Sequence, residues 1–424
     1  MVIIEKYNQF EDFSGDYHSS DWVFLHFIGS KNKHPLNDYP LMLYVRTSSD
    51  KEYILSFGHD EATTDLTLDS LMNLDNDIPK YVADIKSVCH FTDFKNVIDL
   101  QQAEFQKQGN LVDNQIFLTT SHRFFHAKGM NNFVVPIMKH LEYCQDLFTN
   151  YKDNIGDEYN EFYTDANKVF SEIERIGLKV DRLKVPKAQL DNVSKDHLMY
   201  TNYNVLTLTG RPSNAYDGLN FAAMNKSDGS RQMIKSRYDD LIEFDFDAYH
   251  VRLIGKLVGY DFGDESVHEH FSKLYNVSYE DSKSMTFKYM YGGVPDDIAK
   301  THEFFGKVKD YYTKLWSRFK RDKVLVTNIY KRRITLDMKD FYPSKLFNYM
   351  IQSLETERNI LVLKSLLKET KDFESKLVLY HYDSFLFDYN KNDGDKFVEI
   401  VQKELQRDGF PVKMKRGKNY DELI

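Results

Sequence analysis

The sequence predicts an α+β protein of several domains, and three features support this. Residues 22–27, 41–45 and 52–57 alternate apolar and polar positions, which is typical of strands. Residues 157–176 repeat apolar side chains with a helical period up to a glycine, which indicates a helix. Residues 241–246 form an apolar run typical of a buried strand. The 424 residues suffice for two or three domains with cores of their own.

The same patterns predict further elements. Helices are expected around 65–85 and 93–108, so that residues 1–150 would form an α/β domain. A strand is expected over 200–208. Two short apolar runs flank Asp383, which predicts a β-hairpin with this residue at or beside its turn.

The composition is that of an ordinary globular protein. Hydrophobic residues make up 42% and charged residues 29% of the chain. No apolar run approaches the length of a membrane span, and the N-terminus lacks the features of a signal peptide, so we expect a cytoplasmic protein without a membrane partner. Cys89 and Cys144 are the only cysteines, which excludes a disulfide framework and a multi-cysteine zinc site.

The net charge of −9 argues mildly against nucleic acid as a partner, because affinity for phosphates normally comes from Lys and Arg. Basic residues are nevertheless concentrated between Lys307 and Arg333, and again between Lys413 and Lys418. Such runs are either solvated surface or contacts for a polyanion, and the sequence leaves both interpretations open.

Two aspartates are distinguished by their positions. Asp245 ends the strand at 241–246, and Asp383 lies far downstream in the hairpin. A single aspartate at a strand end commonly caps the next helix. If the strand and the hairpin are neighbours, however, the two carboxylates converge, and two Mg²⁺ ions roughly 3.5–4 Å apart would offset their repulsion. That arrangement clamps the reacting oxygens in phosphoryl transfer, so the hypothesis is a nucleotidyl-transfer site.

Lys283, Phe287 and Tyr291 recur every fourth residue and share one face of a predicted helix that ends before two glycines. An aromatic stripe of this kind is usually part of a core. If the helix lies at the edge of a two-metal site, however, the lysine could bind a triphosphate and the aromatic rings could contact its base.

From about residue 165 to the C-terminus these stretches resemble the family A (DNA polymerase I-like) DNA polymerases, of the compact kind found in phages. The motifs occur in the family's order. They are motif A at 245–252, motif B at Lys283, Phe287, Tyr291 and Gly292, motif C at Asp383, the Thr-Gly-Arg-x-Ser signature at 209–213, and the Asn-x3-Gln signature at Asn348 and Gln352.

The resemblance implies the domains of a right-hand polymerase. An RNase H-like, exonuclease-type α/β domain would span 1–150, and a connecting helix with a vestigial thumb 151–200. The palm, with an antiparallel sheet, would comprise 201–254 and 346–424, and helical fingers would span 255–345.

The resemblance also implies roles for single residues. Asp245 and Asp383 would be catalytic and would bind two Mg²⁺ ions, and Lys283 would be a catalytic residue that binds the triphosphate. The other implied nucleotide contacts are Phe246, His250, His268, Phe287 and Tyr291, and the implied DNA contacts are Arg211, Asn348, Gln352 and Tyr382.

Three positions depart from the family's motifs. His250 stands where the family has a Glu that presses on the sugar edge, so discrimination against ribose is an open question. Tyr279 stands where a basic residue usually precedes the motif B lysine, so the phosphates would have one cation fewer. Asp383 is followed by Ser384 where the family has Glu, a pair found in single-subunit RNA polymerases. A single-subunit RNA polymerase or a primase-like enzyme is therefore the alternative interpretation.

The N-terminal domain lacks the carboxylates expected of an exonuclease. Leu25 and Phe27 stand where Asp-x-Glu is expected on the first strand, Lys95 stands at the second motif, and only Asp113 remains. Because a metal nuclease needs carboxylates to hold its ions, we expect no proofreading. These losses also leave open a non-catalytic, DNA-binding remnant of a polymerase.

The leading prediction is a DNA-directed DNA polymerase that adds dNTPs to a primer on template DNA. The interval 182–199 is too short for a thumb, because a helix rises only about 1.5 Å per residue. A separate processivity factor or subunit is therefore an expected partner. A viral origin would place the enzyme in the host cytoplasm.

Overall fold

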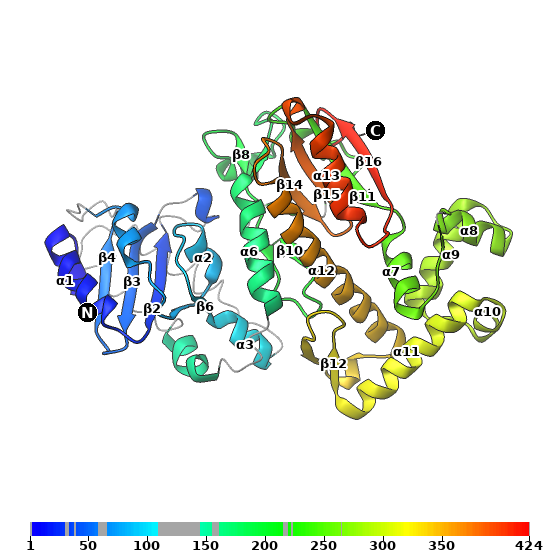
Figure 1. The fold of residues 1–424 in the computed structure, drawn as a ribbon, viewed down its shortest axis with the longest axis horizontal. Helices are drawn as coiled ribbons and strands as arrows, with labels where there is room; N and C mark the ends of the chain where they lie inside the picture. The colour runs from blue at the N-terminus through cyan, green and yellow to red at the C-terminus, as the bar shows by residue number, and fades with distance from the viewer. Residues whose placement is uncertain are drawn as a thin grey trace.

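The computed structural model describes residues 2–29, 34–37, 40–57, 66–108, 145–154, 161–214, 219–221, 224–263 and 265–423. An N-terminal unit built on a sheet, a central unit with a second sheet and a helical unit follow one another along the molecule (Figure 1). In the part of the chain described, none of the helices combines the length and the apolar character needed to cross a membrane.

The N-terminal sheet has six strands in the order β1-β4-β3-β2-β5-β6. Their bounds are β1 (Val2–Ile4), β2 (Val23–Gly29), β3 (Pro40–Thr47), β4 (Glu52–Ser56), β5 (Lys80–Val82) and β6 (Val97–Asp99). Strands β2, β3 and β4 are antiparallel, whereas β5 and β6 run parallel to β2. The three predicted strands are confirmed, and the mixed sheet fits the expected RNase H-like topology.

Both faces of β2 are buried. Leu25 and Phe27 belong to a hydrophobic cluster that includes α1 (Tyr7–His18). Phe24 points to the opposite face, into a cluster that includes α3 (Leu100–Gln108). The two positions assigned from the sequence to exonuclease carboxylates are therefore core positions in this chain.

Three predictions of secondary structure differ from the structure. The expected helix at 65–85 is a 3₁₀ helix (Leu68–Leu74) followed by β5, because parallel pairing with β2 and β6 outweighs the local helical preference. Of the expected strand at 200–208, only β9 (Tyr203–Asn204) pairs, with β10 (Ser213–Asn214). The stretch expected as a helix at 93–108 divides into β6 and α3.

Helix α6 (Glu161–Ile176) joins the N-terminal and central units and corresponds to the helix predicted at 157–176, whose first residues lie outside the described ones. It contacts α2 (Ile85–Cys89) on one side and α12 on the other. The helix ends at Gly177, whose φ of +68° favours glycine. A Cβ atom there would lie 2.8 Å from the Tyr200 ring, so the stop has a steric reason as well.

The central sheet has four antiparallel strands in the order β14-β15-β11-β16. They are β11 (Asp240–Phe246), β14 (Lys376–His381), β15 (Ser384–Tyr389) and β16 (Val412–Gly417). The predicted strand and the predicted hairpin are confirmed, and they are neighbours. Helix α13 (Gly394–Gln406) packs against α12 (Pro343–Thr370), which runs from this sheet into the helical unit (Figure 1).

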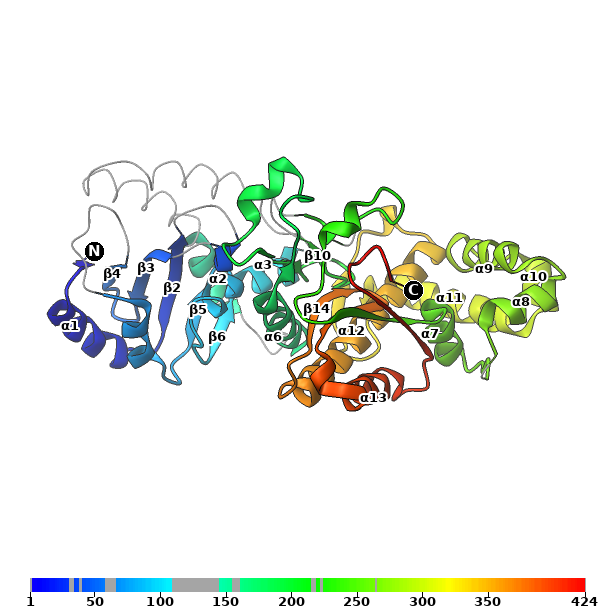
Figure 2. The same cartoon turned by 90° about the horizontal axis from the view of Figure 1, so that it is seen from above.

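The helical unit lies at the end of the molecule opposite the N-terminal sheet (Figure 2). It contains α7 (Tyr249–Val258), α8 (Val267–Tyr275), α9 (Tyr279–Gly292), α10 (Asp296–Thr301), α11 (Glu303–Asp322) and the hairpin of β12 (Val324–Val326) and β13 (Arg333–Thr335). Its side chains form a core distinct from that of the central sheet. The basic run between Lys307 and Arg333 lies on α11 and this hairpin.

The interval between α6 and β9, all of it described, contains no pair of long helices. It holds β7 (Leu178–Lys179), a 3₁₀ helix (Lys187–Asn192) and β8 (Leu198–Met199). The assignment of only a vestigial thumb to this interval stays a prediction.

Candidate active site

A cleft of about 510 Å³ lies where β11, the β14–β15 turn, α7 and α9 meet. Every predicted catalytic and nucleotide-contacting residue lines it, as does one predicted DNA contact. These residues are Asp245, Asp383, Lys283, Phe246, His250, His268, Phe287, Tyr291 and Arg211.

Asp245 and Asp383 both line this cleft because β11, which carries Asp245, is the neighbour of the hairpin whose turn carries Asp383. Asp245 is the register partner of Ser384, and the Phe246 N–H donates to the Asp383 carbonyl oxygen at 3.0 Å. Asp383 is the second residue of a two-residue turn whose first residue, Tyr382, has the positive φ of 60° that such hairpin turns require. Asn359 of α12 donates to the Tyr382 carbonyl at 2.7 Å and fixes the turn.

The two carboxylates are half-buried and repel each other. Burial raises the pKa of Asp245 to about 6, and the charges of Asp383 and Glu243 add to this effect. Burial, followed by the charge of Glu355, also raises the pKa of Asp383, which is partly offset by His250. The two carboxylates thus lie close together without enough positive charge around them to offset their own. Oxygen donors of this kind are the ligands that Mg²⁺ prefers.

Glu243 is a residue of this site that the motif analysis missed. It lies two residues before Asp245, on the same face of β11, and is only 8% exposed. The Ser384 hydroxyl donates to Glu243 Oε1 at 2.8 Å. A carboxylate therefore lies against the position where the family has Glu and this chain has Ser384. The alternation of side chains along a strand could have identified it.

Helix α9 presents its predicted face to the cleft. The Phe287 and Tyr291 rings stack with centroids 5.8 Å apart and planes at 6° to each other, and Lys283 precedes them on the same face. The His268 ring lies 6.1 Å from that of Phe287. Burial, and then the charge of Lys283, lowers the pKa of His268, so this imidazole is neutral. Ser278 caps the helix by accepting from the Asp281 N–H at 3.1 Å.

Glu355 of α12 is a second carboxylate that the sequence did not reveal. It lines the cleft although it is only 1% exposed. Its Oε2 lies 3.2 Å from His250 Nε2 and 3.3 Å from Arg211 Nε. His250 Nδ1 contacts the Tyr291 hydroxyl, so a polar chain links α12, α7 and α9 behind the cleft. No local pattern marks Glu355, because its partners lie in distant parts of the sequence.

The remaining predicted DNA contacts do not line the cleft. The Arg211 guanidinium lies 3.6 Å from the centroid of the Tyr382 ring, beside the β14–β15 turn. Asn348 Nδ2 donates to the Tyr291 carbonyl at 3.4 Å, and Gln352 follows one turn later on α12. Tyr382 and Asn348 therefore each contact a residue that lines the cleft, Arg211 and Tyr291 respectively.

Lys413 supplies a cation that was not predicted for this site. Strand β16 places it opposite Asp245, where it lines the cleft and its Nζ lies 2.5 Å from Asp247 Oδ1. Its charge contributes to the lowered pKa of His268, and Tyr279 lines the cleft as well. Tyr279 thus brings no cation to the cleft, as expected, whereas the neighbouring strand β16 brings a second ammonium group beside that of Lys283.

The N-terminal unit has no comparable site at its predicted positions. Leu25 is fully buried, and Phe27 packs with its ring centroid 5.3 Å from that of Phe91. Lys95 lies at the surface and pairs with Asp75 at 3.3 Å, and Asp113 lies outside the described residues.

The acidic residues at the carboxyl ends of β5 and β6 are Asp84 and Asp99, neither of which was predicted. Burial raises the pKa of both, that of Asp99 to about 8, with the neighbouring charge of Asp84 as the next cause. Lys95 is therefore not the residue that occupies the carboxyl edge of these parallel strands.

No protein-family model and no curated protein matches the chain. One solved structure that it resembles is described as the POL domain of Pol1 from M. smegmatis in complex with a DNA primer-template and dNTP. The similarity covers 99% of this chain and 99% of that chain, with a TM-score of 0.73 and 13% sequence identity. At this identity the comparison shows the fold: the chain has the α+β architecture of a polymerase domain, as the sequence predicted.

Proposed function

We propose that this protein is a template-directed DNA polymerase that adds deoxynucleotides from dNTPs to the 3′ end of a primer. The observation that carries the proposal is that Asp245 of β11 and Asp383 of the adjacent β14–β15 turn line one cleft, whose helical wall presents Lys283. A fold similar to that of a domain described with primer-template and dNTP supports the same conclusion.

The donors at this centre suit two Mg²⁺ ions, because carboxylate oxygens are the ligands of this ion and the two groups repel each other without a cation. Asp245 and Asp383 would hold the ions, which when bound would offset negative charge on the attacking and leaving oxygens. Lys283 and Lys413 would bind phosphate oxygens, as charged donors to an anion. Phe287 and Tyr291 would offer their stacked rings to the sugar and the base.

A primer-extension assay tests the proposal, with dNTPs or rNTPs and with or without Mg²⁺. Asp245→Asn and Asp383→Asn should each reduce incorporation by at least about 1,000-fold, because each removes a metal ligand that contributes several kcal/mol to the transition state. Binding of primer-template should change little. Asp240→Asn is the matched control, since Asp240 lies on the same strand but pairs with Arg416 and Lys418 outside the cleft.

The same assay separates the alternatives. Preference for rNTPs would identify a single-subunit RNA polymerase or a primase-like enzyme, which Ser384 after Asp383 favours. Binding of primer-template without incorporation of either nucleotide would identify a DNA-binding remnant. Extension by the two variants at the wild-type rate would show that the two-metal assignment is wrong.

We further propose a cytoplasmic replication enzyme of the compact phage type that does not proofread. The lack of proofreading is supported by Leu25 and Phe27, which are core residues at the positions where the resemblance would require metal-binding carboxylates. A primer with a mismatched 3′ end should remain intact during incubation with Mg²⁺ and no nucleotides. Degradation that persists in Asp245→Asn, a variant of the other site, would contradict this part of the proposal.

A further inference from the structure

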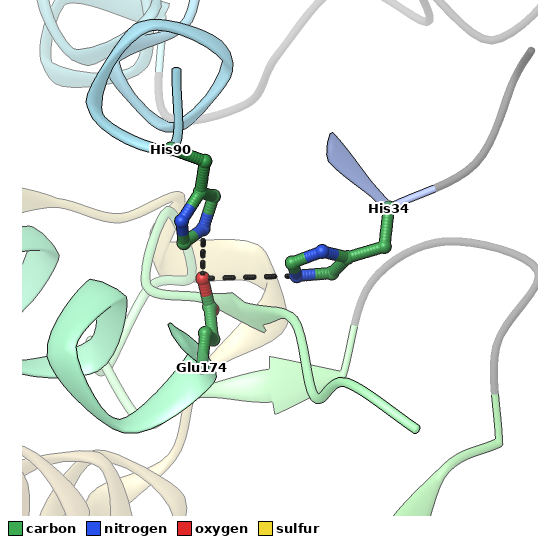
Figure 3. A group of neighbouring side chains, drawn as sticks. All are labelled: His34, His90 and Glu174. Carbon is green, nitrogen blue, oxygen red and sulfur yellow. Dashed lines mark hydrogen bonds and ion pairs between the residues drawn. The ribbon is translucent and has the colours of Figure 1, made fainter. Parts of the chain in front are cut away.

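We infer that His34, His90 and Glu174 form a binding site for a zinc-like divalent cation at the junction of the N-terminal and central units. Their ligand atoms all lie within 4.8 Å of one another. Figure 3 shows the three side chains converging from three separate segments: the turn that contains His34, the end of α2 and helix α6. This site is separate from the cleft and does not depend on the proposed polymerase activity.

The distances suit an ion of this size. Glu174 Oε2 lies 2.8 Å from His90 Nε2 and 4.0 Å from His34 Nε2. Ligands at about 2.0–2.1 Å from a tetrahedral Zn²⁺ lie roughly 3.3 Å apart. These two separations bracket that value, and the third, between the two histidine nitrogens, is at most 4.8 Å.

The donor types select a different ion from that of the cleft. Two imidazoles and one carboxylate, with a fourth position open to water, form a ligand set common at zinc sites. Mg²⁺ prefers oxygen ligands throughout, as in the Asp245 and Asp383 pair. Binding at this site should therefore follow the preference of nitrogen donors for zinc and cobalt over magnesium.

The site is buried, and some of its nitrogens are unsatisfied. The side chains of His34, His90 and Glu174 are 9%, 1% and 0% exposed. Within the described part of the chain, His34 Nε2, the nitrogen that would bind the ion, makes no hydrogen bond. An ion bound to this nitrogen would offset the free-energy cost of burying it without a hydrogen-bond partner.

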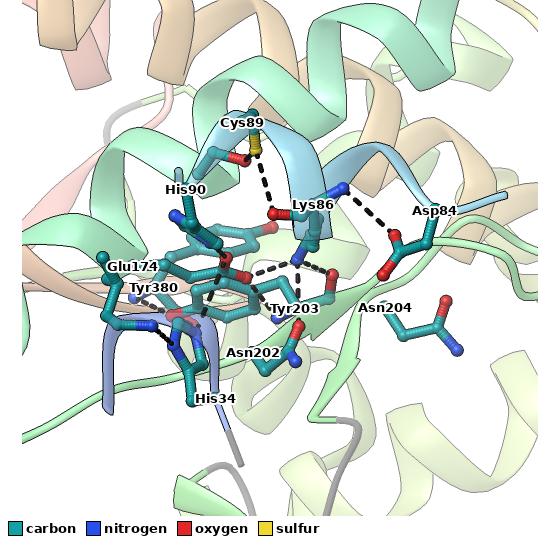
Figure 4. A network of polar contacts seen from close by, with 12 residues as sticks. His34, Asp84, Lys86, Cys89, His90, Glu174, Asn202, Tyr203, Asn204 and Tyr380 are labelled. Atoms are coloured by element: carbon teal, nitrogen blue, oxygen red, sulfur yellow. Dashed lines mark hydrogen bonds and ion pairs between the residues drawn. The ribbon is translucent and has the colours of Figure 1, made fainter. Parts of the chain in front are cut away.

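The second oxygen of Glu174 is already held by other groups (Figure 4). The Tyr203 N–H donates to Glu174 Oε1 at 2.6 Å, and the Lys86 ammonium contacts the same atom. These contacts orient the carboxylate and leave Oε2 directed at the two histidines, as outer-sphere partners of metal ligands do. The charge of Lys86 opposes a cation, so the affinity should be lower than that of a four-ligand structural site.

Binding should also change the hydrogen bonding of His34. The Leu36 N–H donates to His34 Nδ1 at 3.2 Å, which places the imidazole proton on Nε2 in the metal-free protein. Coordination through Nε2 moves this proton to Nδ1 and breaks the contact with Leu36. The shift of the ring toward Glu174 that coordination requires would separate the same two atoms.

An ion held by these three groups would connect two units of the chain. His34 and His90 belong to the N-terminal unit, whereas α6 carries Glu174 into the central core. A ligand that binds only the folded state stabilises it, so zinc should raise the melting temperature by roughly 3–5 °C at saturation. Mg²⁺ at millimolar concentration should not reproduce this shift.

The full-length protein, first treated with a chelator, provides the test. Titration with Zn²⁺ alone should show one tight site per chain by calorimetry, and Co²⁺ alone should give the visible absorption of nitrogen-coordinated, tetrahedral cobalt. His34→Gln and His90→Gln should each weaken binding by at least about tenfold and remove the cobalt bands. Both variants leave the buried Glu174–Lys86 pair in place, so they should fold. The control variants are His18→Gln, at an exposed histidine of α1, and Asp383→Asn, in the cleft.

The outcomes decide between a metal site and a polar contact without metal. Cobalt bands that disappear in both histidine variants, and persist in both controls, would support the inference. Absence of zinc binding by the wild-type protein would overturn it, as would cobalt bands that persist in the His34→Gln, His90→Gln double variant. In that case the three residues would form only a hydrogen-bonded contact between the two units.

Discussion

The Ser384 hydroxyl donates a 2.8 Å hydrogen bond to Glu243 Oε1, and Glu243 shares its face of β11 with Asp245. A third carboxylate thus adjoins the proposed metal-binding pair, although the motif C position that usually supplies one is occupied by serine. Its charge is one of the causes that raise the pKa of Asp245. Of these three carboxylates, Glu243 and Asp245 lie on β11, and Asp383 lies in the turn of the β14–β15 hairpin.

Glu243→Gln should weaken the hold of the site on Mg²⁺. Loss of one negative charge near the ions should raise the half-saturating Mg²⁺ concentration for primer extension roughly three- to tenfold, by Coulomb's law at an intermediate dielectric constant. The measurement is the extension rate as a function of MgCl₂. Ser384→Ala keeps the charge and loses only the hydrogen bond, so its effect should be smaller. An unchanged Mg²⁺ requirement in Glu243→Gln would contradict the role assigned to this residue.

Lys413→Ala should raise the KM for dNTPs about tenfold, because it removes one charged contact of roughly 1.5 kcal/mol to the phosphates. Steady-state kinetics with varied dNTP measures this. Arg416→Ala is the matched control, since Arg416 lies on the same strand and pairs with Asp240. In the Lys413→Ala background, Tyr279→Arg should restore part of the affinity, because it returns a cation to the neighbouring position on α9. Failure of Lys413→Ala to alter KM would remove this lysine from the phosphate site.

Phe287→Tyr should increase the acceptance of dideoxynucleotides. In the family that the motifs resemble, Tyr at this position supplies a hydroxyl where the nucleotide lacks its own, whereas Phe does not. The ring of Phe287 lines the cleft and stacks on that of Tyr291, so the substitution adds a hydroxyl to a side chain of the cleft wall. The ratio of kcat/KM for ddNTP to that for dNTP is the quantity to compare. Equal ratios for both forms would show that α9 does not hold the nucleotide sugar.

Primer extension by the isolated chain should be distributive and strongly salt-dependent. Only the short 3₁₀ helix Lys187–Asn192 and two short strands lie between α6 and β9, and the net charge of −9 offers little general attraction for DNA. Single-turnover extension under a heparin trap measures processivity, and products hundreds of nucleotides long would contradict the prediction. Lys314→Ala with Arg318→Ala, on the exposed face of α11, should reduce the salt slope of DNA binding by about two.

The local sequence pattern was sufficient to predict the strand, the hairpin and the helix that form the cleft. The strand ending at Asp245, the hairpin around Asp383 and the shared face of Lys283, Phe287 and Tyr291 follow from side-chain periodicity and turn chemistry, which act over a few residues. The same reasoning failed at 65–85 and 200–208. There the backbone conformation is set by parallel pairing of β5, and by contacts of Tyr203 with Glu174 and Tyr380.

The sequence alone therefore determined the fold class, the two aspartates and the helix opposite them, because each is encoded within a short window. Only the tertiary structure decided which charges surround them. Lys413 reaches the cleft through the register of β16 on β11, and Glu355 through the path of α12 behind His250. The grouping of His34 and His90 with Glu174 likewise depends on how the N-terminal unit packs against α6. Charges act through space rather than along the chain, so their partners become apparent only when the strands and helices that carry them have been placed.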